Sequence, residues 1–364
     1  MTERSRATMR RALALAHHGW GQTAPNPLVG AVVVAGETVV GEGFHARFGG
    51  PHAEVVALAD AGDRAAGATV FVTLEPCAHH GKTPPCTDAL IAARVARVVA
   101  AVRDPSPVAR GGVEKLRAAG IDVELGVERE AALELNAPFF NAVASERPWI
   151  TLKLAMSADG AIADASRQRR WLTGDDARRE VHHLRAGVDA IAVGIGTALA
   201  DDPSLTVRDV PPPRIAPRRV VFDSTLRLPL DSVLARTARD IPTIAVARRP
   251  DPARARALSS AGVLVIAADT IEQQLHALRS MDIRAMLVEG GARLAGSLLE
   301  ASAVDRLIIF QAPTMLGMGA LRALAYATPD AIAAIEQAPV LGRRAMGDDV
   351  MTIHALRPVP CSPD

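Results

Sequence analysis

Pro51-His52-Ala53-Glu54 opens the stretch that decides how the first half of this chain is interpreted, and Pro76-Cys77 and Pro85-Cys86 complete it. One histidine and two cysteines can hold a zinc ion through an imidazole nitrogen and two thiolate sulfurs. Three protein ligands leave the fourth tetrahedral position open for water, which is typical of a catalytic rather than a structural site. The sequence therefore predicts one zinc ion per chain, held by His52, Cys77 and Cys86.

Glu54 follows the histidine by two residues, where a carboxyl group can carry protons beside the metal without binding it. A bound zinc ion makes hydroxide available near neutral pH, and the hydroxide attacks a ring carbon that bears an exocyclic amine. We expect Glu54 to take the proton from the water and to pass it to the ring and to the departing ammonia. The alternative is a core histidine with two ordinary buried thiols. The combination of all four residues favours the deaminase chemistry.

The sequence around these ligands favours helices. Proline precedes both His52 and Cys86, as is common at the first turn of a helix, and residues 52–58 and 86–93 are rich in Ala, Leu, Val and Ile. The positive end of a helix dipole would favour the thiolate form of Cys86. His79 and His80 lie near the first cysteine, and we expect them to support the ligands or to contact substrate, since three ligands complete the site.

Composition bounds the class of protein. The chain has 364 residues, which suggests two domains, and a net charge of +1 with 3% aromatic residues gives no sign of a nucleic-acid partner. Two of the three cysteines belong to the predicted zinc site, so no disulfide framework is expected and a reducing cytoplasm fits. The apolar run at residues 12–16 is too short for a signal sequence, and no stretch approaches a membrane span of about 20 apolar residues. We expect a cytoplasmic protein without a membrane partner.

Residues 1–147 are predicted to alternate helices and strands. Besides the two helices at the ligands, we expect helices at residues 8–18 and 112–119, a hairpin of residues 28–34 and 38–44, and strands at residues 69–74 and 95–102. Such alternation predicts an α/β domain in which helices pack on the faces of a sheet. Residues 136–147 lead to Pro148, which we interpret as the domain boundary.

Residues 148–364 are predicted to restart the alternation. The predicted strands are residues 149–155, 190–194, 219–222, 243–246, 263–267, 285–288 and 306–310. The predicted helices are residues 175–186 and 271–279, with a further helix after Gly291. Glu289-Gly290-Gly291 forms a turn between strand and helix, where backbone N–H groups can approach a phosphate. The turn does not match G-x-G-x-x-G, so a turn that serves packing alone is the alternative.

Six stretches of this chain match one known family: TAPNPLVG at residues 23–30, TLEPCAHHGKTPPC at 73–86, KLAMSADG at 153–160, WLT at 171–173, LADDPSLTVR at 199–208 and EGG at 289–291. By these stretches the chain resembles the bifunctional riboflavin-biosynthesis deaminase/reductase family along essentially its whole length. Eight residues separate Cys77 from Cys86, whereas cytidine and tRNA-adenosine deaminases resemble P-C-x-x-C. The spacing distinguishes this family from those deaminases.

The resemblance implies an α/β fold with an N-terminal cytidine-deaminase-like three-layer domain, residues 1–147, and a C-terminal dihydrofolate-reductase-like domain, residues 148–364. It implies two consecutive reactions of riboflavin biosynthesis. The first is zinc-dependent hydrolytic deamination of 2,5-diamino-6-ribosylamino-4(3H)-pyrimidinone 5′-phosphate. The second is NADPH-dependent reduction of the ribosyl chain of 5-amino-6-(5-phosphoribosylamino)uracil to a ribityl chain. The expected partners are these small molecules, and a homo-oligomer is left open.

The resemblance also assigns roles to individual residues. It gives zinc to His52, Cys77 and Cys86 and the proton transfer to Glu54. Its implied substrate contacts are Asn26, His45, Lys82 and Asp104 in the deaminase half, and Lys153, Arg169, Arg185, Leu205, Arg208 and Glu289 in the reductase half. Its implied NADPH contacts are Ala155, Trp171, Thr197, Asp201, Ser224, Gly291, Ala292, Arg293, Leu294, Ala295, Gly296 and Ser297.

Physical chemistry supports several of these roles. Arg185 and Arg208 suit a phosphomonoester, because a guanidinium group binds phosphate oxygens in pairs, and Trp171 offers a flat face for a ring. Residues 223–227 follow a predicted strand and combine hydroxyl groups with a cation, which suits the 2′-phosphate of NADPH. Each residue could instead be a solvated charge, a core aromatic or part of an ordinary turn.

Two positions depart from the family pattern. Arg169 stands where the family often has serine, and Asp104-Pro105-Ser106-Pro107 replaces Asp-Pro-Asn-Pro. Ser106 can still form hydrogen bonds, but it offers fewer groups than an amide. These departures affect the expected contacts to substrate and leave the zinc ligands untouched.

Two other functions are weighed against the bifunctional enzyme. A nucleic-acid deaminase with an appended domain is disfavoured by the neutral charge and by the scarcity of aromatic residues for base stacking. The other alternative is an active deaminase whose second domain is regulatory or inactive. The second half has no obvious proton donor, so the sequence excludes this alternative less firmly.

Overall fold

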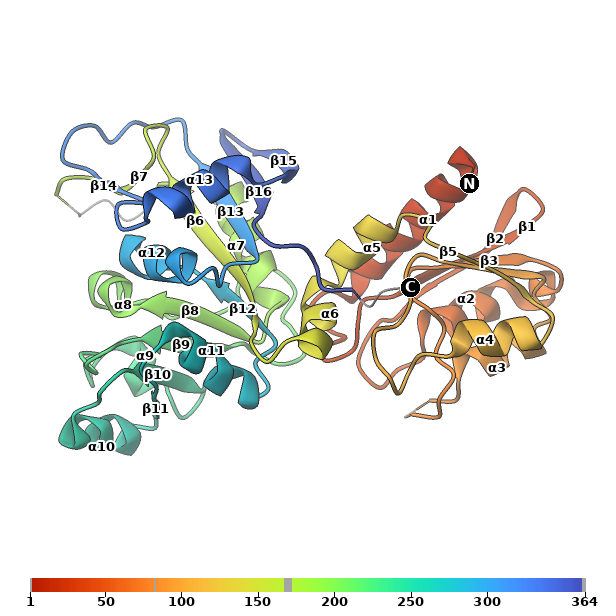
Figure 1. The fold of residues 1–364 in the computed structure, drawn as a ribbon, viewed down its shortest axis with the longest axis horizontal. Coiled ribbons are helices and arrows are strands. Elements are labelled where there is room, and N and C mark those ends of the chain that lie inside the picture. The colour runs from red at the N-terminus through yellow and green to blue at the C-terminus, as the bar shows by residue number, and fades with distance from the viewer. Residues whose placement is uncertain (1, 82, 167–171, 362–364) are drawn as a thin grey trace. The chain divides into compact units, whose positions relative to one another are not determined.

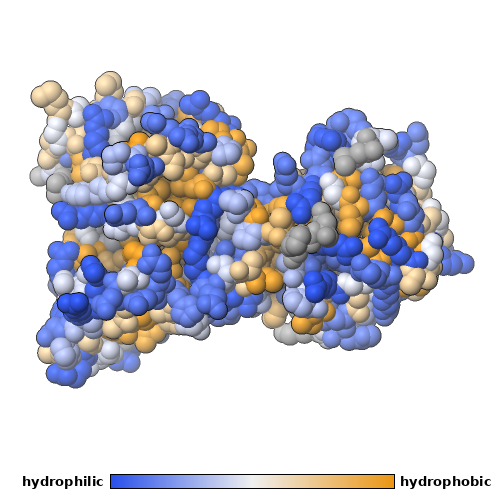
Figure 2. Space-filling view, viewed as in Figure 1, coloured by the Kyte–Doolittle hydropathy of each residue, from blue (hydrophilic) through white to orange (hydrophobic). Residues whose placement is uncertain are grey.

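The computed structural model describes residues 2–81, 83–166 and 172–361 (Figure 1). The chain divides into two compact units, the first made of residues up to Ala144 together with residues 359–361, and the second of Ser145–Pro358. Among the described residues, no helix has the length and apolar character needed to cross a bilayer. On the face drawn in Figure 2, hydrophilic residues predominate and apolar residues show in limited areas between them.

A mixed sheet forms the middle layer of the first unit. Its strands lie in the order β2-β1-β3-β4-β5. Their bounds are Gly30–Ala35 for β1, Thr38–Phe44 for β2, Thr69–Val72 for β3, Arg97–Ala100 for β4 and Asp122–Leu125 for β5. β1 pairs antiparallel with β2 and β3, whereas β3, β4 and β5 run parallel. The carboxyl ends of β3 and β4 therefore meet at one edge of the sheet.

Helices cover both faces of this sheet. In β1, Val33 packs in a core with Leu90 and Leu116, whereas its neighbour Val32 packs with Met9 and Phe140. Because side chains alternate across a strand, these two cores lie on opposite faces. The helices are α1 (Glu3–Ala16), α2 (Ala53–Ala61), α3 (Cys86–Ala92), α4 (Gly112–Ala118), α5 (Arg129–Leu135) and α6 (Ala137–Ala144), with short 3₁₀ turns at His17–Gly19 and Gly62–Ala65. The expected three layers are present.

A glycine lets α2 lie close to the sheet. A Cβ atom on Gly43 of β2 would lie 2.5 Å from both the Ala53 carbonyl oxygen and the Ala57 nitrogen. No other residue type fits such an approach without displacing the backbone. The close packing fixes the N-terminus of α2, which His52 caps in an extended conformation.

The second unit is built on a larger sheet, with the strand order β11-β10-β9-β8-β12-β6-β13-β16-β15. The strands are β6 (Trp149–Met156), β8 (Ala190–Gly194), β9 (Arg218–Phe222), β10 (Thr243–Ala247), β11 (Leu264–Ala267), β12 (Ala285–Val288), β13 (Arg306–Gln311), β15 (Val340–Met346) and β16 (Asp349–Ala355). Neighbouring strands from β11 to β13 are parallel, and β16 and β15 add antiparallel strands at one edge. The carboxyl ends of β9, β8, β12 and β6 therefore lie next to one another.

Two cores cover the two faces of this sheet. Ile191 and Val221 belong to one core, while their neighbours Ala192 and Val220 belong to the other. The surrounding helices are α7 (Asp175–Ala186), α8 (Ile195–Asp201), α9 (Val233–Arg236), α10 (Pro252–Ser260), α11 (Ile271–Ser280), α12 (Ala292–Glu300) and α13 (Pro329–Gln337). A separate pair of short strands joins β7 (Ala161–Ala163) and β14 (Leu321–Arg322).

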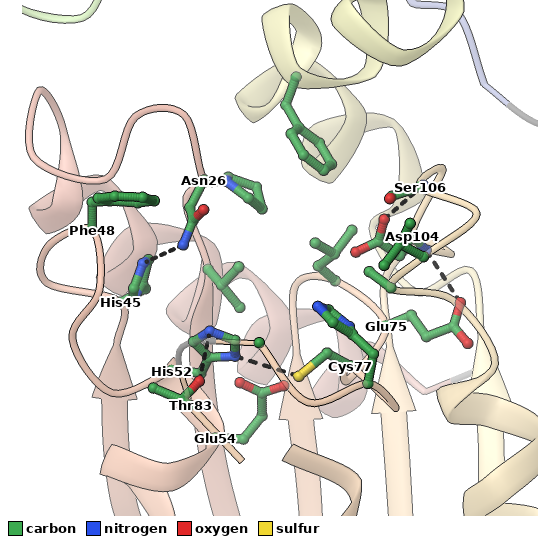
Figure 3. Close-up of a pocket in the computed structure, with 18 of the residues that line it drawn as sticks. Asn26, His45, Phe48, His52, Glu54, Glu75, Cys77, Thr83, Asp104 and Ser106 are labelled. Atoms are coloured by element: carbon green, nitrogen blue, oxygen red, sulfur yellow. Dashed lines mark hydrogen bonds between the residues drawn. The ribbon is translucent and has the colours of Figure 1, made fainter. Parts of the chain in front are cut away.

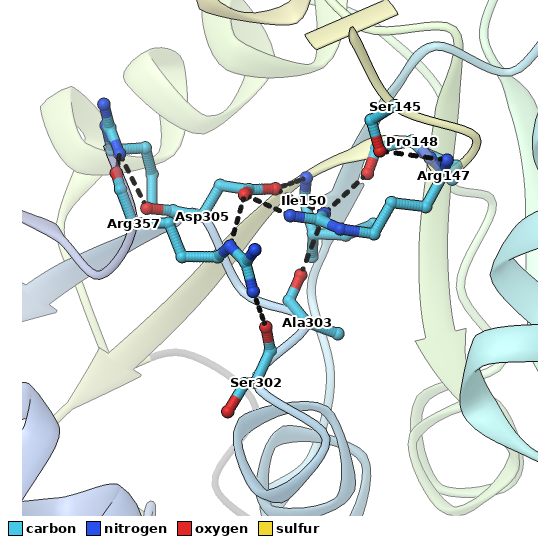
Figure 4. A network of polar contacts seen from close by, with 9 residues as sticks. Ser145, Arg147, Pro148, Ile150, Ser302, Ala303, Asp305 and Arg357 are labelled. Carbon is cyan, nitrogen blue, oxygen red and sulfur yellow. Dashed lines mark hydrogen bonds and ion pairs between the residues drawn. The ribbon is translucent and has the colours of Figure 1, made fainter. Parts of the chain in front are cut away.

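A buried carboxylate ties together the places where the chain enters and leaves the second unit (Figure 4). Asp305 accepts two hydrogen bonds from the Arg147 guanidinium, at 2.5 and 2.7 Å, and one from the Ile150 N–H at 2.8 Å. Arg357, which follows β16, approaches the same carboxylate at 3.8 Å. Asp305 is only 1% exposed, so its charge requires compensation, and these donors provide it.

Most predicted elements are present, with shifted ends. The predicted strands at residues 69–74 and 95–102 are shorter as β3 and β4. Prediction missed β5, β7, β14, β15 and β16 and helices α5, α6, α8, α9, α10 and α13. For α10 and α13 a signal was available, because Asp251-Pro252 and Thr328-Pro329 place a capping side chain before proline, and both side chains cap in the structure.

Candidate functional site

The three predicted zinc ligands meet at the carboxyl edge of the first sheet, and Figure 3 shows two of them, His52 and Cys77. His52 caps α2, Cys86 is the first residue of α3, and Cys77 lies in the loop after β3. The three ligand atoms lie within 4.8 Å of one another. Both sulfurs are buried. Two helix N-termini thus deliver two of the ligands, as the proline positions predicted.

The histidine nitrogen that faces the sulfurs is Nδ1. It lies 3.1 Å from Sγ of Cys86 and 3.5 Å from Sγ of Cys77. Across the ring, Nε2 lies 3.4 Å from the hydroxyl oxygen of Thr83. When Nε2 donates to this hydroxyl, Nδ1 keeps its lone pair for a metal. The donor set fits zinc, and Thr83 is a supporting contact that the sequence interpretation missed.

The thiols of Cys77 and Cys86 depend on each other. The hydrogen bond from Cys86 is the main cause that lowers the pKa of Cys77 to about 4. The same bond, followed by burial, raises the pKa of Cys86. The Cys86 backbone N–H also donates to the Cys77 sulfur at 3.4 Å. One thiolate therefore forms readily, and a bound zinc ion would stabilise both thiolates.

Glu54 lies in the first turn of α2, with its carboxylate directed toward His52 and Cys77 (Figure 3). It is 3% exposed, and burial raises its pKa to about 7. A carboxyl group with a pKa near neutrality can both accept and release a proton at physiological pH. The charge of a bound zinc ion would act in the opposite direction and favour the carboxylate.

His52, Cys77 and Glu54 line a pocket of about 310 Å³. On one side, Nδ1 of His45 lies 2.9 Å from the Pro51 carbonyl oxygen, and Nε2 lies 3.2 Å from the amide nitrogen of Asn26. Because a carbonyl oxygen only accepts, Nδ1 carries the hydrogen and Nε2 accepts from Asn26. Burial lowers the pKa of His45, which favours this neutral ring. The Asn26 amide is thereby turned so that its oxygen can accept from a ligand.

Asp104 and Ser106 stand on the opposite side of this pocket (Figure 3). Burial raises the pKa of Asp104 to about 6, and its carboxylate accepts the Ser106 N–H at 2.8 Å. His79 also lines the pocket, and within the described part of the chain its buried Nδ1 has no hydrogen-bond partner. His80 is exposed. Lys82, the remaining expected contact of this half, lies outside the described residues.

In the second unit, the expected NADPH contacts gather at the carboxyl ends of four neighbouring strands. Ala155 is near the end of β6, Thr197 follows β8 in α8, Ser224 follows β9, and Gly291 follows β12. Ligands of open α/β sheets commonly bind outside this edge. A Cβ atom on Gly291 would lie 3.1 Å from Oγ1 of Thr197, which is a tight contact, so glycine leaves the most room for a ligand at this backbone. The arrangement fits a dinucleotide.

The segment from Gly291 to Ser297 serves two purposes. Gly291 caps α12 without a side-chain hydrogen bond, and Arg293 and Ser297 are exposed. Ala292, Leu294 and Ala295 are buried instead, and a Cβ atom on Gly296 would lie 2.4 Å from the Tyr326 carbonyl oxygen. The buried members therefore fix the helix, and the first turn and the exposed members remain available to a cofactor. Asp201, at the end of α8, is exposed as well.

A charged cluster lies beside this edge. Glu289 follows β12 and receives two hydrogen bonds from Arg185 of α7, at 2.5 and 3.0 Å. Arg185 also donates to the Thr206 carbonyl at 2.8 Å, and Nζ of Lys153 lies 4.0 Å from the carboxylate. Burial alone would raise the pKa of Glu289, but Arg185 and Lys153 outweigh it and the net pKa is lowered. Burial, helped by Arg185, lowers the pKa of Lys153.

The loop after α8 approaches this cluster. Leu205 is buried with a positive φ of 48°, which strains a residue with a side chain. The Arg208 N–H donates to Nδ1 of His182 at 3.3 Å, and its exposed guanidinium lies 3.3 Å from the Ser204 hydroxyl. Burial, then Arg185 and Arg208, lower the pKa of His182 to about 4, so His182 accepts as a neutral ring. The sequence interpretation missed His182.

Arg169 and Trp171 lie outside the described residues. The other expected contacts of the reductase half lie at or beside the carboxyl edge of the sheet, but their roles stay predictions. The pairing of Arg185 with Glu289 was not foreseen, and it leaves Arg185 less available to a phosphate than Arg208.

Two family descriptions match this chain. The cytidine and deoxycytidylate deaminase zinc-binding region matches residues 2–102, and the RibD C-terminal domain matches residues 148–329. The riboflavin biosynthesis protein RibD of Aquifex aeolicus is 44% identical over 314 residues, which cover 85% of this chain and 87% of the relative. The RibD of Escherichia coli is 44% identical over 336 residues, 86% of this chain and 88% of the relative.

Solved structures agree along the whole chain. Form 1 of Acinetobacter baumannii RibD has a TM-score of 0.82 at 37% identity and covers 97% of this chain and 99% of its own. The Thermotoga maritima diaminohydroxyphosphoribosylaminopyrimidine deaminase/5-amino-6-(5-phosphoribosylamino)uracil reductase has a TM-score of 0.83 at 35% identity, with 97% and 98% covered. The expected α/β fold, with a cytidine-deaminase-like first domain, is confirmed.

Proposed function

Because this chain belongs to the RibD family of bifunctional riboflavin-biosynthesis enzymes, we propose that its two units carry out the two reactions in sequence on one pyrimidine phosphate. The chain is a zinc-dependent deaminase and an NADPH-dependent reductase, and the alternative of an inactive second half is not supported. The substrate we propose for deamination is 2,5-diamino-6-ribosylamino-4(3H)-pyrimidinone 5′-phosphate. The domains we propose are residues 1–147 and 148–364.

In deamination, His52, Cys77 and Cys86 would hold the metal and Glu54 would move the protons. The chemistry that zinc supplies when bound is to lower the pKa of water to about 7. The Glu54 carboxylate would take the first proton from the water and give it to the ring nitrogen. It would then take the second proton from the added hydroxyl group and give it to the amine, which leaves as ammonia as the carbonyl forms. Asn26, oriented by His45, accepts from the pyrimidine on one side, and Asp104 faces it from the other.

In reduction, the cofactor would lie along the carboxyl edge of β9, β8, β12 and β6. When bound, NADPH supplies a hydride to the sugar carbon. Lys153 and Glu289 are partly buried titratable groups beside that position, and the lowered pKa of Lys153 favours release of a proton from Nζ. Arg185 holds the Glu289 carboxylate in place, and Arg208 is the better anchor for the terminal phosphate of the substrate.

The observation that carries this proposal is the cluster of His52, Cys77 and Cys86, with Glu54 lining the same pocket as His52 and Cys77. The test is incubation of the protein with the pyrimidine phosphate, with and without NADPH, while ammonia and NADPH absorbance are followed. Ammonia should appear without NADPH, and NADPH should be consumed only as the deaminated compound forms. NADPH consumption that outpaces ammonia release would contradict the proposed order.

We propose a cytoplasmic location, supported by the free thiols of the described residues Cys77, Cys86 and Cys361, which suit a reducing compartment. The proposed partners are the small-molecule substrates, and we propose no nucleic acid. A homo-oligomer remains an open expectation.

The loop after β9 predicts a preference for NADPH over NADH. Ser224 and Arg227 are both exposed there, and the loop is fixed because Asp223 accepts the Leu228 N–H at 2.8 Å. Replacing Ser224 and Arg227 together with alanine should weaken NADPH binding about 10- to 100-fold and NADH binding far less, since only NADPH has the 2′-phosphate. Fluorescence titration with both cofactors measures this difference.

The matched control for this pair is Arg284→Ala. Arg284 precedes β12, so it removes one positive charge from the opposite, amino edge of the sheet, where it pairs with Asp282. It should leave both affinities unchanged. An equal loss for NADPH and NADH in the double variant would place the 2′-phosphate elsewhere.

Arg208 is predicted to bind the phosphate of the sugar chain. Arg208→Ala should slow reduction by about 10- to 100-fold, the loss expected for one charge-assisted contact, and should leave deamination unchanged. On the dephosphorylated substrate the variant should perform no worse than wild type, because the contact is already missing. Steady-state rates with both substrates measure the two effects.

Arg185→Ala is the contrasting variant. Since Arg185 holds Glu289 by two hydrogen bonds, its loss should impair reduction of the phosphorylated and dephosphorylated compounds alike. If instead Arg208→Ala causes a further large loss on the dephosphorylated compound, Arg208 supports the loop rather than the phosphate.

A further inference from the structure

Glu75 is a buried carboxylate that the chemistry described above does not use. It follows β3, lies two residues before the zinc ligand Cys77, and is 3% exposed. Its Oε1 accepts the N–H groups of Gly111 at 3.1 Å and Val113 at 3.0 Å, and its Oε2 accepts the Asp104 N–H at 3.1 Å. Three N–H donors thus compensate one buried charge.

These donors belong to a single segment that forms one wall of the deaminase pocket. The segment begins at Asp104 after β4 and ends at the first turn of α4, and Asp104, Ser106, Val108 and Ala109 from it line the pocket. In Figure 3 the Asp104 and Ser106 side chains stand across the pocket from Asn26 and His45, and the hydrogen bond to Glu75 lies on the side of Asp104 away from Asn26 and His45.

The wall and the zinc loop also interlock through their backbones. The Ala78 N–H donates to the Ala109 carbonyl at 3.3 Å. A Cβ atom on Gly112 would lie 1.8 Å from the Pro76 carbonyl oxygen, so only glycine allows this approach. The position of the wall is therefore set relative to the zinc ligand, and Glu75 supplies the side-chain bonds that hold it.

We infer that Glu75 is a positioning residue for deamination, which holds the wall that carries Asp104 and Ser106 at a fixed place relative to Cys77. The inference rests on the proposed deaminase function. Glu75 is not a second proton carrier, because both of its oxygens are occupied by backbone N–H groups. It acts on the substrate through Asp104 and Ser106.

The test is Glu75→Gln. Glutamine offers one oxygen and one NH₂ group, so in either orientation the NH₂ group faces a backbone N–H that has lost its acceptor. We expect zinc content and NADPH-dependent reduction of the deaminated compound to stay at wild-type values, and kcat/KM for deamination to fall about 10- to 100-fold. Wild-type kcat/KM in this variant would overturn the inference. Absence of deamination in the wild-type protein would instead overturn the proposed function.

The matched control is Glu114→Gln. Glu114 lies on α4, next to Val113, and pairs on the surface with Arg103 at 2.9 Å. The substitution therefore makes the same chemical change outside the pocket. Deamination by this variant should stay at the wild-type rate, because exposed ion pairs contribute little. A loss equal to that of Glu75→Gln would show that the charge of this region matters and not the hydrogen bonds.

A double-mutant cycle separates positioning from folding. If Glu75 acts through Asp104, then Glu75→Gln should cost much less in an Asp104→Ala background than in wild type. If Glu75→Gln lowers kcat/KM for deamination by the same factor in both backgrounds, the inference is contradicted. If Glu75→Gln fails to fold, hydrogen exchange in the wild-type protein still tests whether the bonds to Glu75 hold the wall. The amides of Asp104, Gly111 and Val113 should then exchange slowly. Fast exchange at these three amides would show that the bonds to Glu75 do not hold the wall.

Discussion

Glu54→Gln is expected to lower the rate of deamination by about 10²–10⁴-fold while zinc stays bound. The amide keeps the shape of the side chain but cannot carry a proton, and Glu54 is not among the groups that meet at the metal position. Burial of Glu54 raises its pKa to about 7, so the wild-type group is suited to both accept and release a proton. Ammonia release and metal content, measured on the same preparation, test both parts.

The reductase half provides the internal control. The Glu54→Gln protein should still reduce the deaminated ribosyl compound at the wild-type rate when that compound is supplied. Glu37→Gln, at an exposed residue that pairs with Arg4, makes the same chemical change and should alter neither reaction. Ammonia release close to the wild-type rate in Glu54→Gln would show that another group carries the proton.

The core of the deaminase site could be predicted because the residues that carry out its chemistry lie in short sequence motifs. The types and spacing of His52, Cys77, Cys86 and Glu54 restrict the reaction before any fold is known. The supporting contacts could not be predicted in the same way. Thr83 and Glu75 both lie in the stretch that carried the family resemblance, but their roles depend on which backbone N–H or ring nitrogen they meet.

The reductase site depends on contacts between distant parts of the chain. Arg185 and Glu289 are 104 residues apart, and their pairing follows from the way α7 packs beside the end of β12. The sequence predicts that Arg185 and Arg208 are both cations suited to a phosphate. In the structure the Arg185 guanidinium is already engaged by Glu289, which supports Arg208→Ala as the variant that tests phosphate binding.

Some of the elements that prediction missed leave little pattern in the sequence. α5 and α6 have 7 and 8 residues, so neither shows enough turns for a helical period to be recognised. β15 is an edge strand whose residues are mostly exposed, and it therefore lacks the alternation of a half-buried strand. α7 has buried residues at helical spacing and β13 is a largely buried apolar run, so both leave a clear pattern and were predicted close to their observed ends.

Cys77→Ala is expected to abolish zinc binding and deamination together. A site with three protein ligands becomes weak when one is lost, and only His52 and Cys86 would remain here to hold the metal. Zinc occupancy should fall below roughly a tenth of the wild-type value, and ammonia release should fall to background. Metal analysis and the ammonia assay measure the two losses.

Cys361→Ala separates the loss of a ligand from the loss of a thiol. Cys361 is exposed and lies outside the zinc site, so this variant should keep both metal and activity. Reduction of the deaminated compound should survive in all of these variants, because the cofactor edge lies in the other unit. Full zinc occupancy in Cys77→Ala would remove Cys77 from the ligand set. In that case His79 should be substituted next. His79 lines the same pocket, and its buried Nδ1 has no hydrogen-bond partner among the described residues.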